Sequence, residues 1–356
     1  VGRYRRWKWW AAAIAVTLAV LLVAGNRTFN SWVDRTELPV TLAETSTEVR
    51  DRNGQLLRAY PVGTGIWRLA VHPDQVDPDF LSMLVRYEDK RFWTHSGVDP
   101  WAFVRAAGQA LWNGRAVSGG STLTMQVARL LEDGSTGRWQ GKLRQARLAL
   151  ALEQRLSKQQ ILTLYLTHAP YGGNLEGIRA ATLAWFGKEP RRLTASQSAL
   201  LVALPQSPER RRPDRAHDTA RAARDRVLSR MARQGVIDAD EMQMAQTESV
   251  PRKMVPFAQL APHLADRILA ADPETQRFDL TIDAGVQARM EQLLRDATRQ
   301  QGARLSAAMV VADYQTGEVL ASVGSPGYRD TQRLGFVDMT QALRSPGSTL
   351  KPLIYG

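Results

Sequence analysis

The 356-residue sequence contains no cysteine, so structural disulfides and thiolate metal sites are excluded. Its five histidines never occur at the HxxH or HxxxH spacing of zinc motifs. The Gly-Lys-Ser/Thr of a P-loop is missing, as are internal repeats and low-complexity tracts. These absences exclude disulfide scaffolds, zinc modules, P-loop nucleotidases and repeat proteins.

Acidic residues are in the minority. The chain has 47 Lys and Arg against 35 Asp and Glu, a formal net charge of +12. This excess favours an anionic partner such as nucleic acid, anionic lipid or a phosphorylated substrate. The hydrophobic content of 44% argues against global disorder, and the length allows more than one domain.

The N-terminus has the pattern of a membrane anchor. A basic stretch at residues 1–8 contains no acid and leads through three tryptophans into an uncharged run that ends at Gly25. Residues 9–25 are just long enough to span a bilayer. A cleavable signal peptide is the alternative, but no good A-x-A site follows Val23. We therefore predict an uncleaved signal-anchor with residues 26 onward outside the cytoplasm, which disfavours a nucleic-acid partner.

Two kinds of pattern follow the anchor. The pair Asn53-Gly54 between alternating segments predicts a β-hairpin within residues 44–60. From about 74 to 240, apolar residues recur every three to four positions, which predicts an α-rich domain. The clearest predicted helices are 79–87, 101–112, 122–131, 138–156, 158–166, 194–204 and 219–234.

The pattern changes after a segment punctuated by three prolines. A strand near 278–282, a helix at 284–298, a buried strand at 307–313 and a returning strand at 318–323 predict a second, α+β domain. The predicted division is a cytoplasmic tail 1–8, a transmembrane segment 9–25, a linker with hairpin 26–60, a helical domain 61–240, a linker 241–278 and the α+β domain 279–356.

The segment from Glu88 to Gly97 places a carboxylate pair beside aromatic and basic residues. Adjacent residues on a helix point about 100° apart, so Glu88 and Asp89 cannot both line one site and one of them is structural. Taken alone, an acid that ends a helix is usually a solvated charge. The residues of this segment follow the order E-D-x-x-F-x-x-H-x-G, which includes Phe92 and His95.

A second segment runs from a glycine turn into a hydroxyl-rich helix start, Gly119-Gly120-Ser121-Thr122-Leu123-Thr124-Met125-Gln126. A flexible turn with a Ser or Thr N-cap would explain these residues by themselves. The predicted helix places Thr122, Gln126 and Arg129 on one face, and its N-terminal amides and dipole would suit a phosphate.

Together these segments resemble the first two signature motifs of the peptidoglycan glycosyltransferases, membrane enzymes that polymerise a lipid-linked wall precursor. The resemblance covers about residues 40–240 and implies a mainly α, lysozyme-like glycosyltransferase domain after one transmembrane helix. It implies that Glu88 is the general base. The residues that it implies for substrate binding are Asp89, Phe92, His95, Ser121, Thr122, Gln126, Arg129, Lys142, Gln145 and Asn174.

The third motif departs from the family pattern. Lys142 corresponds to the lysine that contacts the substrate pyrophosphate, but Gln145 replaces the glutamate that most members carry three residues later. Glu153 lies too far along the helix to substitute and is expected to pair with a neighbouring helix. A lipid pyrophosphate is already a stable leaving anion, so Lys142 and Arg129 could stabilise it electrostatically. A divalent cation such as Mg²⁺ is a further candidate for this charge, and the sequence calls for no other cofactor.

The fourth and fifth motif regions also fit the family. The segment Gly172 to Ile178 supplies the G-x-N-x-x-G-I pattern around Asn174 and continues to Trp185-Phe186-Gly187-Lys188. The segment Leu204-Pro205-Gln206-Ser207-Pro208 fits the fifth motif, although Gln197 stands where glutamate is common. These details are most similar to class A bifunctional penicillin-binding proteins.

The second domain contains one motif of a penicillin-binding transpeptidase. Ser348 and Lys351 form S-x-x-K within R-S-P-G-S-T-L-K-P, and their spacing would let an unprotonated lysine activate the hydroxyl. No S-x-N and no K-T/S-G motif occurs in the chain. We therefore expect an incomplete, inactive transpeptidase domain, in a fragment or a truncated gene product.

The function that the resemblance implies is polymerisation of lipid II at the bacterial inner membrane, in a single-pass protein with its catalytic part in the periplasm. Its expected partners are lipid II, the growing glycan strand, the membrane and other proteins of wall synthesis. A muramidase-like hydrolase and a non-catalytic lipid II-binding scaffold are the alternatives. Gln145, Gln197 and the incomplete second domain motivate the scaffold.

The missing transpeptidase motifs give a direct prediction. This chain should not be labelled covalently by a fluorescent penicillin, because two of the three walls of the acylation site are absent. The measurement is gel fluorescence after incubation of the purified protein with the labelled drug. Stable labelling at Ser348 would contradict the prediction.

Overall fold

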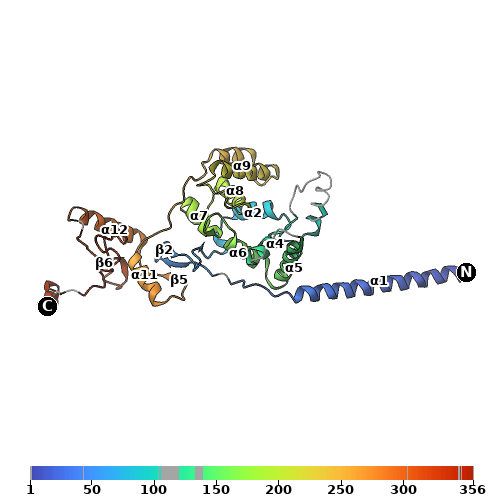
Figure 1. Cartoon of the computed structure of the whole chain (residues 1–356), viewed down its shortest axis with the longest axis horizontal. Coiled ribbons are helices and arrows are strands. Elements are labelled where there is room, and N and C mark those ends of the chain that lie inside the picture. Colours follow the sequence, from blue (N-terminus) through green and yellow to red (C-terminus); the bar gives the residue numbers. More distant parts are fainter. Residues whose placement is uncertain are drawn as a thin grey trace. The chain divides into compact units, whose positions relative to one another are not determined.

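A computed structural model of the chain describes all residues except 1, 43, 103, 106–119, 133–138, 303, 344, 346 and 356. It forms two compact units. The helical unit comprises Val1–Ala43, Ala70–Thr182 and Lys188–Lys253, and the sheet unit comprises Glu44–Leu69, Leu183–Gly187 and Met254–Gly356. The boundary near residue 183 falls within one helix, α7 (Figure 1).

The elements are numbered in chain order, with the labels that Figure 1 uses. The helical unit contains α1 (Gly2–Asp34), η1 (Pro73–Gln75), α2 (Pro78–Glu88), α4 (Leu123–Leu131), α5 (Trp139–Arg155), α6 (Lys158–His168), β4 (Leu175–Glu176), the first part of α7 (Ile178–Phe186), α8 (Ala195–Ala203), η2 (Leu204–Gln206), α9 (His217–Arg233) and α10 (Ala239–Thr247). Those of the sheet unit are β1 (Thr47–Arg50), β2 (Leu56–Tyr60), β3 (Trp67–Arg68), α11 (Pro262–Ala271), β5 (Arg277–Asp279), α12 (Ala284–Arg299), β6 (Met309–Ala312), β7 (Val319–Val323), η3 (Gly347–Leu350) and α13 (Lys351–Tyr355).

Helix α1 is longer than the apolar run that was expected to span the membrane. Among the described residues, one helix segment, Ala13–Asp34, is long and apolar enough to cross a membrane. The expected segment was 9–25, and the helix continues past it to Asp34. Gly25 does not end α1, because one glycine costs only about 1 kcal/mol in a helix of this length and no proline follows it.

Two arginines of α5 hold the C-terminal end of α1. Arg147 donates from Nε and Nη2 to the carbonyl of Trp32, at 3.0 and 2.7 Å, and its guanidinium lies 4.7 Å from the centre of the Trp32 ring. Arg155 donates to the carbonyls of Asp34 and Thr36, at 2.7 and 3.0 Å. These bonds satisfy carbonyls that a helix end leaves without intrahelical partners, and cations there also complement the helix dipole.

The helical unit forms its core where α4 packs on α5 and α6, and α2 packs on α8 and α9. Asp77 begins α2 by accepting from the backbone N–H groups of Asp79 and Phe80, and its other oxygen accepts from Leu193 N–H at 2.7 Å. One side chain therefore caps α2 and ties it to the segment that leads into α8. The predicted helices at 79–87, 122–131, 138–156, 158–166, 194–204 and 219–234 are confirmed to within a few residues.

Other expectations were incomplete or wrong. The predicted helix 101–112 lies largely outside the described residues. The stretch 241–278 is not a plain linker: most of α10 and all of α11 lie in it, and Pro262 occupies the first turn of α11, where proline costs no hydrogen bond. Strand β6 alternates between half-buried and exposed residues, with Val310 54% exposed, so it is not the fully buried strand that its apolar run predicted.

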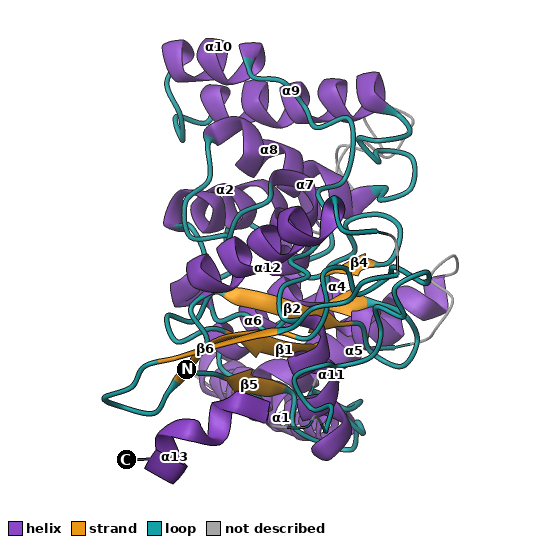
Figure 2. Ribbon diagram, turned by 90° about the vertical axis from the view of Figure 1, so that its left-hand side faces the viewer, coloured by secondary structure: helices purple, strands orange, loops and turns teal. Residues whose placement is uncertain are grey.

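The sheet unit joins segments far apart in the sequence. The predicted hairpin is confirmed: β1 pairs antiparallel with β2 across a turn in which Gly54 has a φ of 78°. On its other edge β1 pairs in parallel with β5, which gives the strand order β2-β1-β5 (Figure 2). Val49, Leu57, Ala265, Ile282 and Ala284 form the buried cluster against this sheet. The hairpin therefore belongs to a sheet completed by the C-terminal part of the chain.

Gly97 fixes the loop that follows α2. Its φ is 88°, and a Cβ atom placed on it would lie 2.6 Å from the carbonyl oxygen of Ala149 in α5. The carbonyl of Gly97 in turn accepts a hydrogen bond from the Thr122 hydroxyl at 2.5 Å. Only a residue without a side chain lets the loop approach α5 this closely in a left-handed conformation.

Replacement of Gly97 should therefore destabilise the helical unit. We expect Gly97→Ala to lower the free energy of unfolding by about 2–4 kcal/mol, from backbone strain together with the clash against α5. The matched control is Gly235→Ala, which has a φ of 69° but no atom within 4 Å of the new Cβ, and should cost about 1 kcal/mol. Denaturant unfolding followed by circular dichroism in detergent measures both. Equal losses in the two variants would contradict the assigned role.

Candidate active site

Residues of the Glu88–Gly97 segment and of the segment around Ser121–Gln126 meet in a cleft of about 1000 Å³ within the helical unit. The end of α2 and the loop after it, the N-terminal half of α4, η2 and α9 all contribute to its walls. The side chains that line it are Tyr87, Glu88, Asp89, Lys90, Arg91, Asp99, Trp101, Ala102, Arg105, Ser121, Thr122, Gln126, Arg129, Gln206 and Arg230.

Glu88, the last residue of α2, is half-buried and held from two sides. Gln126 of α4 donates its amide N–H to Glu88 Oε2 at 2.8 Å, and Gln206 of η2 donates to Oε1 at 2.8 Å. Each carboxylate oxygen thus has one amide donor. The two bonds fix the plane of the carboxylate in the cleft wall, as a positioned general base requires.

Gln206 is itself fixed by Arg211. Arg211 Nη1 donates to Gln206 Oε1 at 3.1 Å and to the carbonyl of Ala203 at 2.5 Å. With its oxygen occupied by this cation, the Gln206 amide must present its NH₂ group to Glu88. Burial lowers the pKa of Arg211, and repulsion from Arg226 acts in the same direction, whereas Glu88 raises it. A three-residue chain therefore runs from Arg211 through Gln206 to the carboxylate.

Asp89 faces the other way, which confirms that only one of the two adjacent acids is free to present its carboxylate to the cleft. Asp89 is 6% exposed, and its Oδ2 accepts from His95 Nε2 and from the backbone N–H of Leu123, both at 2.8 Å. His95 packs against the buried ring of Phe92. The predicted substrate-binding residues Asp89, Phe92 and His95 thus lie in the internal structure under the cleft.

The first backbone N–H groups of α4 already donate hydrogen bonds to side chains within the protein. Thr122 caps the helix by accepting from Met125 N–H at 3.1 Å, and Leu123 N–H donates to Asp89. The expectation that the N-terminal amides would hold a phosphate is therefore weakened, because two of them already have acceptors and a carboxylate already meets the dipole. Further along α4, Gln126 reaches Glu88 and exposed Arg129 lines the same cleft.

Lys142 lies beside this helix start. Its ammonium donates to Ser121 Oγ at 2.7 Å. Desolvation lowers the pKa of Lys142 from its ordinary value, and repulsion from the nearby Arg129 acts in the same direction. Two cations this close favour an anion between them, which fits the predicted pyrophosphate contact.

Further basic residues line the cleft, among them Lys90, Arg105 and Arg230. Desolvation lowers the pKa of Lys90, with further repulsion from Arg86, Arg230 and Arg105. Arg230 donates to the carbonyl of Tyr87 at 3.0 Å and lies 4.3 Å from the centre of its ring. Arg91 is neutralised by an ion pair with buried Asp99. Apart from Asp89 and Asp99, which are paired with His95 and Arg91, the cleft therefore places one carboxylate, Glu88, among several cations.

The remaining predicted residues lie apart from Glu88. Gln145 is 3% exposed on α5 and does not line the cleft that the described residues form. Glu153 accepts from Thr124 and from Lys158, both at 2.6 Å, so it pairs with neighbouring helices as expected. Asn174 is exposed in the turn before β4, and Gly119 lies outside the described residues.

Ser348 and Lys351 lie in the sheet unit, at the junction of η3 and α13. Both residues are exposed. In the part of the chain that the structure describes, no hydrogen bond joins the Ser348 hydroxyl to the Lys351 ammonium. Nor does any group of three or more His, Cys, Asp or Glu among the described residues form a possible metal site.

Sequence reasoning missed Gln206 and Arg211 as parts of the site. The segment Leu204-Pro205-Gln206 was recognised as a motif, but nothing in the sequence links it to a carboxylate 118 positions earlier. The Leu-Pro-Gln pattern was the one sequence feature that could have indicated this role. It forms a 3₁₀ turn, with the proline in its first two positions, directly after α8, and the turn points the polar side chain of Gln206 away from the buried face of that helix.

Comparison with known proteins agrees with this geometry. The family model described as Transglycosylase matches residues 53–232, about half of the chain. Penicillin-binding protein 1C of Escherichia coli (strain K12) is 45% identical over 322 residues, covering 90% of this chain and 41% of that protein. Penicillin-binding protein 1B of Vibrio cholerae is 32% identical over 308 residues, with coverage of 81% and 39%. Penicillin-binding protein 1A of Escherichia coli (strain K12) is 34% identical over 203 residues, with coverage of 57% and 24%.

The chain thus spans less than half the length of each of these relatives. The family match covers the segment that contains Glu88, α4, Lys142 and Gln206. On this evidence, the chain belongs to the transglycosylase family.

Proposed function

We propose that the helical unit is a peptidoglycan glycosyltransferase that polymerises lipid II into β-1,4-linked glycan strands, a proposal supported by the match to the Transglycosylase family model. The observation that carries the proposal is the Glu88 carboxylate, held by Gln126 and Gln206 in the cleft. The other two acids of the cleft, Asp89 and Asp99, are paired with His95 and Arg91, and its remaining charged residues are cationic. A base beside a cationic region suits a reaction whose leaving group is a pyrophosphate.

In the proposed reaction Glu88 removes the proton from the 4-hydroxyl of the acceptor's N-acetylglucosamine. That oxygen attacks the anomeric carbon of the donor's N-acetylmuramyl end, and the bond to undecaprenyl pyrophosphate breaks with inversion. Lys142 and Arg129 would take up the charge that develops on the pyrophosphate. The buried position of Gln145 supports a reaction that needs one carboxylate only.

The anchor supports access to a lipid-linked substrate. The segment Ala13–Asp34 is apolar, and α5, which carries Lys142, also holds the end of α1 through Arg147 and Arg155. We propose that α1 keeps the cleft at the surface of the inner membrane, with the helical unit on the periplasmic side. The fold of this unit is proposed to be lysozyme-like. Residues 279–356 are proposed to be the N-terminal part of an incomplete transpeptidase domain, in which Ser348 and Lys351 correspond to the nucleophile and its base.

Glu88→Gln tests the chemical step. Because the amide keeps the size of the side chain but cannot accept a proton, we expect the rate of polymerisation to fall by about 10²–10⁴-fold. The assay incubates detergent-solubilised protein with labelled lipid II and separates polymer from substrate on gels. Glu132→Gln, an exchange in a partly exposed ion pair with Arg144 outside the cleft, is the matched control and should retain activity.

The same assay separates the alternatives. Polymer from the wild type but not from Glu88→Gln supports the glycosyltransferase. Cleavage of finished glycan without polymer would instead identify a hydrolase, and binding of lipid II without turnover would identify a scaffold.

Gln206 is proposed as a positioning residue for Glu88. Gln206→Ala should lower kcat about 10- to 100-fold with little change in the KM for lipid II, because the carboxylate loses one of its two fixed donors. Gln206→Glu should move the acidic limb of the pH–rate profile to higher pH, because a second carboxylate disfavours ionisation of the first. Gln154→Ala, an exposed glutamine of α5, is the control. Unchanged kcat in Gln206→Ala and an unchanged profile in Gln206→Glu would remove Gln206 from the site.

A further inference from the structure

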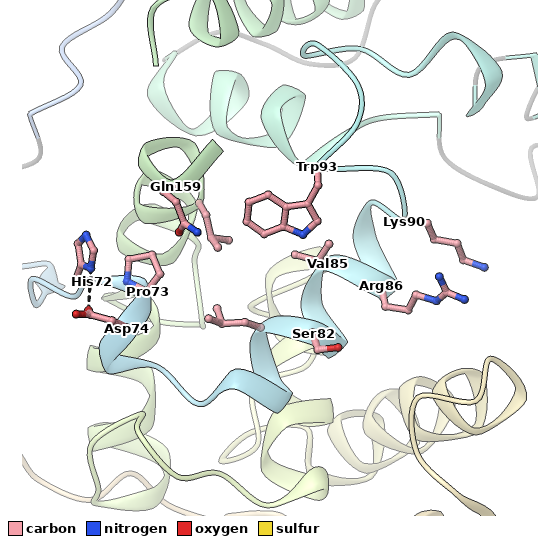
Figure 3. Close-up of a pocket in the computed structure, with 11 residues that line it drawn as sticks. His72, Pro73, Asp74, Ser82, Val85, Arg86, Lys90, Trp93 and Gln159 are labelled. Atoms are coloured by element: carbon pink, nitrogen blue, oxygen red, sulfur yellow. Dashed lines mark hydrogen bonds and ion pairs between the residues drawn. The ribbon is translucent and has the colours of Figure 1, made fainter. Parts of the chain in front are cut away.

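A second hollow opens in the helical unit beside α2, lined by residues other than those that hold Glu88 (Figure 3). Its volume is about 640 Å³, within the range of about 300–1,000 Å³ typical of small-molecule sites. The residues around it come from η1, α2, the loop after α2 and the start of α6: His72, Pro73, Asp74, Leu81, Ser82, Val85, Arg86, Lys90, Trp93, Gln159 and Leu162.

Trp93 dominates the hollow. Its indole extends over the space between α2 and α6 in Figure 3, and the side chain is 52% exposed. The ring of buried Phe92 meets it edge-on with centres 4.9 Å apart, so the indole is held from behind. Below it lie Val85, 9% exposed, and Leu162, 2% exposed. A large aromatic surface held in place over an apolar floor is suited to stacking against a flat ligand.

The rim is polar, and its charge differs from end to end. His72 and Asp74 occupy one end and bond to each other, Nδ1 to Oδ1, at 2.7 Å. Arg86 and Lys90 occupy the other end, where no acid of the described residues pairs with either of them. Ser82 and the amide of Gln159 lie between the two ends. A fatty acyl chain would leave these groups without partners, whereas a ligand with both C–H faces and hydroxyl groups would satisfy them.

Lys90 connects the hollow with the active-site cleft, because its side chain lines both. A polymer that leaves the cleft past Lys90 therefore meets Arg86 and Trp93 next. Glycan built from N-acetylglucosamine and N-acetylmuramic acid has apolar ring faces, hydroxyls, amides and carboxylates on its muramyl groups. The apolar ring faces could stack on the Trp93 indole, the hydroxyls and amides could bond to Gln159, and the carboxylates could pair with Arg86 and Lys90.

We propose that the hollow under Trp93 is a saccharide-binding site for the nascent glycan strand, with Trp93 stacking on a sugar ring and Arg86 and Lys90 facing muramyl carboxylates. The site rests on the proposed glycosyltransferase function, since that reaction supplies the strand. It would hold the product near the cleft between successive additions, and so lengthen strands without taking part in bond formation.

Strand length is the first test. With labelled lipid II and the full chain in detergent, Trp93→Ala should shorten the mean strand about fivefold, because loss of an aromatic contact weakens retention by about that factor. The initial rate of lipid II consumption should stay within about twofold, since Glu88 and its partners are untouched. Trp93→Phe should retain intermediate lengths, and Gln154→Ala on α5 should match the wild type.

Direct binding is the second test, and it does not depend on turnover. The probe is a soluble tetrasaccharide of alternating N-acetylglucosamine and N-acetylmuramic acid, and chitotetraose is its uncharged counterpart. By calorimetry, wild type and Glu88→Gln should bind the acidic probe alike, and Trp93→Ala about fivefold more weakly. Arg86→Gln should abolish the preference for the acidic probe over chitotetraose.

The outcomes separate the two proposals. Unchanged strand length and unchanged saccharide binding in Trp93→Ala would overturn the site while leaving the glycosyltransferase intact. Saccharide binding that depends on Trp93, in a protein that makes no polymer, would support the site and overturn the proposed function. If Trp93→Ala does not fold, Gln159→Ala and Arg86→Gln carry the same test, because both residues are exposed at the rim.

Discussion

The buried carboxylate of Asp89 is the contact on which the geometry of the cleft depends. It ends α2, accepts from His95, and accepts from the first amide of α4. These bonds fix the angle between α2 and α4, because a buried charge that lost either donor would cost several kcal/mol. With Asp89 turned inward, Glu88 one residue earlier must face outward, where Gln126 of the same α4 can reach it. The position of the proposed base thus follows from its neighbour's burial.

The same contact changes how an anionic substrate would be held. A helix start is a ready anion site when its amides are free, but in α4 the Asp89 carboxylate and the Thr122 hydroxyl already accept from two of them. The positive charge that remains for a pyrophosphate comes from side chains, chiefly Lys142 and Arg129. Side-chain cations can move with a leaving group, whereas backbone amides cannot. This arrangement also reduces the need for a second carboxylate at position 145.

Helix α5 links the parts of the proposed machinery. It carries Lys142 near its start, receives the Gly97 loop at Ala149, and binds the end of α1 through Arg147 and Arg155. If α1 is the membrane anchor that we propose, a helix with these contacts would keep the cleft close to the membrane. Lys90, in the loop after α2, lines both the cleft and the hollow under Trp93 and so joins them. Substrate would then enter from the membrane, and product would leave along a charged and aromatic path.

The sequence by itself determined much of the local structure and singled out the residue that we propose as the base. Periodicity placed most helices to within a few residues, Asn53-Gly54 set the hairpin, and the motif order singled out Glu88, because these signals are local. Tertiary structure alone decided that Asp89 is bonded inside the protein, that Gln206 and Arg211 support Glu88, and that the hairpin joins β5 in one sheet. The Gln206–Glu88 bond and the β1–β5 pairing join residues more than a hundred positions apart. No local propensity encodes them, because they depend on how distant elements pack within each unit.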